Sequence, residues 1–126
     1  MICEPNDAKI EDALFKACLA ANERGWNIVY GFYGHRDLKC CCPMTALAMT
    51  EQENVWDEDG FVELLELDAA LTKFGFPTGV LDAIGVDIFE GFDGFAFTNE
   101  TKMKWYLVGQ NVRDRLEAEG IFPQRG

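Results

Sequence analysis

Residues 99–120 read NETKMKWYLVGQNVRDRLEAEG and carry the clearest pattern in the chain. Four apolar residues in this stretch recur at steps of three and four: Trp105, Val108, Val112 and Leu116. Because an α-helix has about 3.6 residues per turn, this spacing places them on one face. Asn99 is a favourable N-cap and Gly120 a favourable stop. We therefore predict a helix whose apolar face packs into a core.

Helical spacing also recurs earlier in the chain. A first helix is predicted from Asp7 to Arg24, capped by Asn6, with its buried stripe formed by Ile10, Leu14, Ala17, Cys18 and Ala21. Pro43 suits the first position of a second helix that continues to Thr50. A third begins at Phe61 and ends at Gly75. Two short helices follow, one around residues 80–84 that stops at Gly85 and one from Asp87 to Phe92 that ends in Gly91-Phe92-Asp93-Gly94.

A β-hairpin is predicted between the first two helices. Alternate residues from Trp26 to Phe32 are strand formers, Gly34 to Asp37 is turn-like, and Leu38 to Cys41 returns as the second strand. The fold expected is therefore a mainly α (α+β) single domain spanning 1–126. It contains about five helices and one short β-hairpin.

Composition limits the classes of function. The chain has 126 residues, 22 Asp and Glu against 11 Lys and Arg, and a formal net charge of −11. Affinity for nucleic acid and for anionic membranes comes from Lys and Arg, so we expect neither as a direct partner. No apolar run approaches the ~18 residues that span a bilayer, and residues 1–5 lack the features of a signal peptide.

The chain contains five cysteines: Cys3, Cys18, Cys40, Cys41 and Cys42. An odd number with three in succession makes a poor disulfide framework, so we predict reduced thiols and a cytoplasmic location. Cys42 precedes the helix predicted at Pro43, where free amides and the helix dipole favour a thiolate, and Lys39 and Arg36 are near in sequence. Cys40, Cys42 and the single histidine, His35, are therefore candidates for a reactive thiol or a metal site.

The structural interpretation of these cysteines is favoured over the reactive one. Free cysteines are commonly inert core residues, and the sequence lacks the paired Cys-x-x-Cys spacing of zinc sites. On a regular strand Cys40 and Cys42 share one face and Cys41 takes the other.

An acidic loop is the candidate cation site. Residues 57–66, Asp-Glu-Asp-Gly-Phe-Val-Glu-Leu-Leu-Glu, partly match an EF-hand, with Asp57, Asp59 and Glu66 as ligands and Gly60 at the turn. Val55 stands at the first ligand position and offers no side-chain oxygen. Acidic loops before helices are also ordinary structural features.

Four strings resemble a group of small bacterial and phage proteins of unassigned function, in which a Cys-Cys-Pro-Leu-like and a Gly-Phe-Asp-Gly-like string each precede a helix. They are Cys41-Cys42-Pro43-Met44-Thr45-Ala46-Leu47, Ala83-Ile84-Gly85-Val86, Gly91-Phe92-Asp93-Gly94, and Leu107-Val108-Gly109 followed by Arg113. The resemblance implies no activity and carries no functional residue. It implies that the strings belong to one fold.

These observations favour a small acidic, non-enzymatic binding or accessory protein. A phage-borne inhibitor of a basic protein partner is the form expected, since an acidic protein is complementary to a nucleic-acid-binding surface. No motif calls for a cofactor, and no catalytic template is present. The alternative is a thiol- or metal-dependent protein that uses the Cys40–Cys42 cluster. The sequence does not indicate an oligomeric state.

Overall fold

The computed structural model describes residues 5–76, 84–94 and 103–125. These ranges contain five helices: α1 (Pro5–Glu23), α2 (Pro43–Glu51), α3 (Leu64–Phe74), α4 (Ile84–Asp93) and α5 (Met103–Ala118). They also contain four short strands: β1 (Asn27–Tyr30), β2 (Gly34–His35), β3 (Cys40–Cys41) and β4 (Gln124–Arg125). The chain is therefore mainly α-helical with a small β element, which confirms the predicted fold class.

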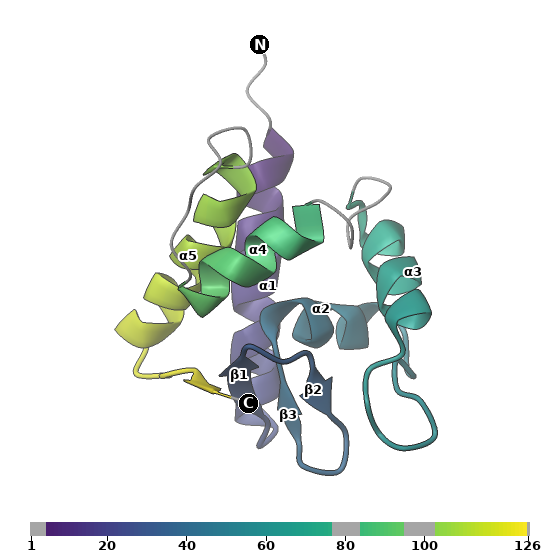
Figure 1. The fold of residues 1–126 in the computed structure, drawn as a ribbon. Coiled ribbons are helices and arrows are strands. Elements are labelled where there is room, and N and C mark those ends of the chain that lie inside the picture. Colours follow the sequence, from purple (N-terminus) through teal and green to yellow (C-terminus); the bar gives the residue numbers. More distant parts are fainter. Residues whose placement is uncertain (1–4, 77–83, 95–102, 126) are drawn as a thin grey trace.

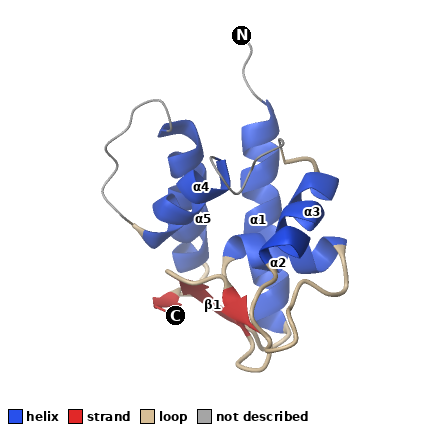
Figure 2. Ribbon diagram, turned by 45° about the vertical axis from the view of Figure 1, so that its right-hand side comes forward, coloured by secondary structure: helices blue, strands red, loops and turns tan. Residues whose placement is uncertain are grey.

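Helices α2 and α5 pack on α1, α3 packs on α2, and α4 packs on α5. Figure 1 shows α5 along one side of α1 and α2 across its lower half, with α3 beyond α2; α4, which packs on α5, crosses in front of α1 in this view. The strands gather at the end of the molecule where α1 finishes (Figure 2). Within the described ranges, no helix is both long enough and apolar enough to cross a membrane.

The apolar faces predicted from helical spacing form the core. All five residues of the α1 stripe are buried, as are Val108, Val112 and Leu116 of α5, while Trp105 is half-buried. On α3, Leu67 and Leu71 have no exposed surface. The packing face of α5 is therefore confirmed.

The pairing of the strands differs from the predicted hairpin. The sheet order is β2-β3-β1-β4, and β1 runs parallel to β3, with Ile28 opposite Cys41. The antiparallel hairpin is formed by β2 and β3 instead, with Gly34 opposite Cys41. Residues 26–32 and 38–41 therefore do not form one antiparallel hairpin. After β1 the chain forms the short strand β2 at Gly34 and His35, and β2 is the strand that pairs antiparallel with β3.

Three helix boundaries also differ from the sequence prediction. α1 begins at Pro5, so Asn6 lies within the helix rather than before it. α3 begins at Leu64, because Phe61 and Val62 form β-bridges with His35 and Trp56. α4 continues through Gly85, which was expected to stop a helix, and ends at the predicted Gly91–Gly94 string. Residues 80–83 and Asn99 lie outside the described residues.

Candidate functional site

The cysteine cluster lies where β3 leads into α2. Cys41 and Cys42 belong to the main core and have no exposed surface, whereas Cys40 is buried outside that core. The strand ends at Cys41 and Cys42 is the N-cap of α2, with φ −84° and ψ 169°. Cys41 and Cys42 thus both contribute to the core, on either side of the boundary between β3 and α2. Pro43 begins the helix as predicted.

Burial dominates the electrostatics of Cys42. Its Sγ lies 3.5 Å from Thr45 Oγ1 and makes no capping hydrogen bond to the backbone. Burial raises the pKa of Cys42 above its ordinary value, outweighing the lowering effect of Thr45 and of the first amides of α2. The Asp93 carboxylate raises it further. The helix terminus thus acts as expected from the sequence, but desolvation is the larger effect, and the thiol form is favoured.

Two further buried thiols, Cys18 and Cys41, follow the same rule. Burial raises the pKa of Cys18 on α1 and of Cys41, and in both cases the neighbouring cysteines add to the shift. Cys18, Cys40, Cys41 and Cys42 are free thiols. Because the thiolate is the nucleophile, these shifts favour packing over reactivity.

The Cys-Cys-Pro string and the Gly-Phe-Asp-Gly string lie close together in the fold. The Cys42 amide donates to the Tyr33 carbonyl at 3.0 Å, and the Tyr33 ring stacks on Phe89 of α4 with ring centroids 4.8 Å apart. At the end of α4, Asp93 Oδ1 accepts a hydrogen bond of 2.7 Å from the Gly31 amide. The β1–β2 connection therefore ties the Cys-Cys-Pro string to the Gly-Phe-Asp-Gly string. No spacing in the sequence signals this contact.

Arg113 of α5 completes the junction. Its Nη1 donates to the Phe92 carbonyl at 2.9 Å and its guanidinium lies 4.5 Å from the centre of the Tyr30 ring. A cation at the free carbonyls of a helix C-terminus is stabilising. Asp93 and Arg113 thus have structural roles, and nothing in the sequence pattern signals the partners of either side chain.

His35 lies in different surroundings from Cys42. Its Nδ1 accepts a hydrogen bond of 3.2 Å from the Asp37 amide, and its ring packs edge-on against Phe61 at 4.6 Å. Cys40 Sγ is 4.0 Å from the His35 carbonyl oxygen rather than bound to the imidazole. Among the residues described, no three His, Cys, Asp or Glu side chains are grouped to hold a metal ion.

The residues of the candidate cation loop make local hydrogen bonds. Asp57 Oδ1 accepts from the amides of Asp59 and Phe61, at 2.9 and 3.0 Å. Glu66 Oε1 accepts from Gln52 Nε2 at 2.8 Å. The structure therefore does not bring Asp57, Asp59 and Glu66 to one point, and two of these carboxylates hold the loop and the start of α3 in place.

An exposed acidic and apolar surface occupies this loop. Residues 57–66, here called the acidic apolar segment, contain five carboxylates and three exposed apolar side chains, Phe61, Leu64 and Leu65. Leu65 is 79% exposed, and Leu38, in the turn between β2 and β3, is 69% exposed. Exposed apolar side chains gathered in one place mark interaction surfaces more often than scattered ones do.

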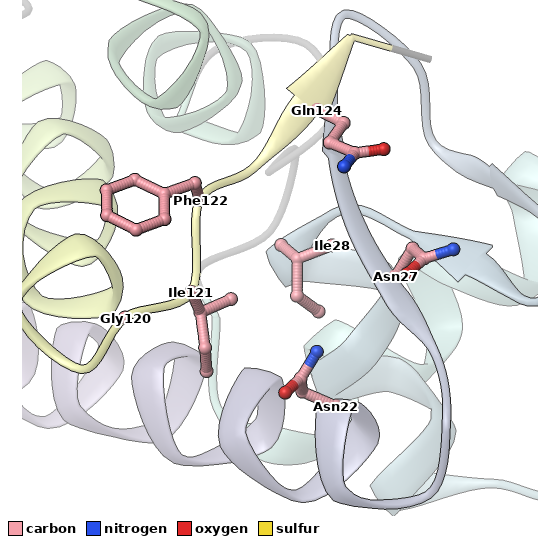
Figure 3. A pocket seen from close by; sticks show the side chains of 7 residues that line it. All are labelled: Asn22, Asn27, Ile28, Gly120, Ile121, Phe122 and Gln124. Atoms are coloured by element: carbon pink, nitrogen blue, oxygen red, sulfur yellow. The ribbon is translucent and has the colours of Figure 1, made fainter.

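A small open pocket lies beside the start of β1, between the end of α1 and the segment that follows α5 (Figure 3). It has a volume of about 190 Å³ and is lined by Asn22, Asn27, Ile28, Gly120, Ile121, Phe122 and Gln124. The Phe122 ring points away from the three amides. Ligand pockets are usually larger, about 300–1,000 Å³, and mostly apolar. This pocket holds no charged or nucleophilic side chain, so its chemistry indicates no reaction.

No protein-family model matches this chain, and comparisons with curated proteins and with solved structures find no similar protein. The assignment of function therefore depends on the side chains themselves. The resemblance to small bacterial and phage proteins stays a prediction.

Proposed function

We propose that this chain is a small acidic, non-enzymatic accessory protein that binds a basic protein partner. The observation that carries the proposal is the separation of charge along the chain. Residues 40–72 contain eight Asp and Glu and no Lys or Arg, a net charge of −8 compared with −11 for the whole chain. The negative potential of these carboxylates attracts a basic partner over a distance and orients it before contact.

Some of these carboxylates make hydrogen bonds within the chain, and this narrows the set that a partner would contact. The Glu63 carboxylate caps α3 by accepting from the Leu65 amide, and Asp57 and Glu66 make the contacts described above. Glu53 and Glu58 are exposed. These two exposed carboxylates are the groups that a basic surface would contact. If the basic surface of the partner normally binds nucleic acid, this chain would inhibit that binding by occupying the surface.

The thiol alternative has less support. Catalysis by Cys42 requires an accessible thiolate, but the side chain has no exposed surface and burial raises its pKa. The Asp93 carboxylate also raises the pKa of Cys42 and so opposes ionisation of the thiol. We therefore propose the binding function alone.

The experiment is an affinity capture with the purified chain from extracts of its native host, followed by reconstitution with the purified captured protein. We expect a basic partner whose affinity falls as salt is raised, because screening weakens charge attraction. The double variant Glu53→Gln/Glu58→Gln should bind about two- to thirtyfold more weakly, since exposed ion pairs contribute about 0.2–1 kcal/mol each.

The matched control is Glu23→Gln/Glu119→Gln. It removes the same charge from two exposed positions outside residues 40–72. Equal weakening by both double variants would mean that only net charge matters. A captured partner that is acidic, or binding that does not respond to salt, would contradict the proposal.

A further inference from the structure

The acidic apolar segment and the turn beside it expose apolar side chains, which the charge of the segment does not explain. Phe61, Leu64 and Leu65 expose apolar surface within five consecutive residues, which span at most about 15 Å. Leu38 exposes more in the adjoining turn, whose Arg36 amide donates to the Gly60 carbonyl at 2.8 Å. Exposing apolar side chains to water is unfavourable, so a partner that covers them gains free energy.

This surface is held in place before any partner binds. The loop is closed by hydrogen bonds from the Asp57 amide to the Phe61 carbonyl, 2.7 Å, and from the Glu63 amide to the Val55 carbonyl, 2.8 Å. The Phe61 ring packs edge-on against His35 and against Phe32. Because the side chain is already positioned, binding loses little conformational entropy.

The charge around these residues selects among possible occupants. A second copy would bring the five carboxylates of its own segment against the same surface. Anionic lipid headgroups and nucleic acid are repelled for the same reason. An occupant that covers the apolar side chains and is attracted to the five carboxylates must itself carry apolar side chains flanked by Lys or Arg.

The backbone indicates the form of that occupant. An added β-strand needs unpaired amides and carbonyls along an edge. In this loop the amides of Asp57, Asp59 and Phe61 are already bonded within the chain, as is the Gly60 carbonyl. A helix satisfies its own backbone groups and binds through side chains alone.

We propose that the acidic apolar segment, with Leu38, docks a cationic amphipathic helix of the partner protein. This inference rests on the proposed function and specifies the partner's contacting element. The apolar face of the helix covers Phe61 and Leu65, and its flanking Lys or Arg residues face the carboxylates of the segment.

The test uses two synthetic peptides of identical Leu and Lys composition, each about five helical turns long. In one, the leucines form a single helical face, and in the other they are distributed around the helix. Binding is measured by fluorescence anisotropy with the full-length protein at low and physiological salt. We expect the amphipathic peptide to bind at least about tenfold more tightly, since burying even one or two leucines contributes that much.

The variant Leu38→Ser/Leu65→Ser should remove this preference and leave the weaker, salt-sensitive binding of both peptides. Its matched control is Leu107→Ser/Phe122→Ser, which changes two exposed apolar residues of α5 and the C-terminal segment. Equal affinity of the two peptides for the wild type overturns this inference alone. Failure of both peptides to bind at low salt overturns the proposed function as well. Loss of the preference in the control but not in the test variant would place the docking surface elsewhere.

Discussion

Gly91 of α4 and Gly109 of α5 lie reciprocally at the crossing of these helices. A Cβ atom on Gly91 would collide with the Tyr106 carbonyl of α5, and one on Gly109 would collide with the Ile88 carbonyl of α4. Both glycines are helical and buried. Each helix therefore presents a position without a side chain to the backbone of the other, and this permits their close approach.

Replacing Gly109 by Ala should destabilise the protein by about 1–3 kcal/mol or more, because the added methyl group meets backbone atoms that cannot move aside easily. The sign is informative, since Ala is favoured over Gly within an isolated helix by about 1 kcal/mol. The measurement is urea denaturation, with Gln110→Ala at an exposed position of the same helix as the control. An unfolding free energy that rises in Gly109→Ala would contradict this packing.

Replacing Cys41 by Ser should destabilise the fold by about 1–3 kcal/mol, because a hydroxyl is buried where the thiol packed. Cys41→Ala should cost less, since it adds no polar group. Cys40→Ser is the matched control: its side chain lies near the His35 carbonyl, to which a hydroxyl can donate. Thermal denaturation of the three variants compares these costs, and a Cys41→Ser variant as stable as Cys40→Ser would refute the account.

Alkylation of the folded protein should be slow at Cys18, Cys41 and Cys42 near neutral pH. Burial raises the pKa of each of these thiols, so little thiolate is present and access is limited. Mass spectrometry after timed iodoacetamide treatment assigns the rate at each cysteine. Labelling should accelerate with added urea. Rapid labelling that vanishes in Cys42→Ala would instead support the thiol function.

Asp93 should make stability depend on pH. Burial raises the pKa of Asp93 above its ordinary value of 3.8, although the Gly31 amide and Arg113 act to lower it. The folded state therefore holds this proton more tightly than the unfolded state, and its contribution to stability falls as pH rises from 3.8 through the folded pKa. Asp93→Asn keeps an acceptor for Gly31 but does not ionise. Its stability relative to wild type should increase over that pH range and then level off, as measured by denaturation at each pH. A pH-independent difference would show that the carboxylate is not desolvated.

Asp57 should control the order of the acidic loop. Its Oδ1 accepts two backbone hydrogen bonds, so Asp57→Ala leaves the amides of Asp59 and Phe61 without that acceptor. We expect faster hydrogen exchange at these two amides and a loss of about 1 kcal/mol of stability. Asp57→Asn, which retains the acceptor, is the control. Unchanged exchange in the Ala variant would mean that the loop is held by other contacts.

The sequence by itself determined the helical faces. The stripes on α1 and α5 follow from spacings of three and four residues, and Pro43 and Gly75 mark boundaries through their own backbone preferences. These signals are local, because each depends on residues within one or two turns. The acidity of residues 40–72 was likewise legible from composition.

Only the tertiary structure decided how these elements meet. The parallel pairing of β1 with β3, and the contact of Asp93 with Gly31 across 62 positions, depend on where distant segments return. The ionisation of Cys42 was decided in the same way: the helix terminus is a local feature, but desolvation by the surrounding core is larger and has no local signal. The exposure of Leu64 and Leu65 at the start of α3 is likewise a property of the tertiary packing, which spacing along the chain does not record.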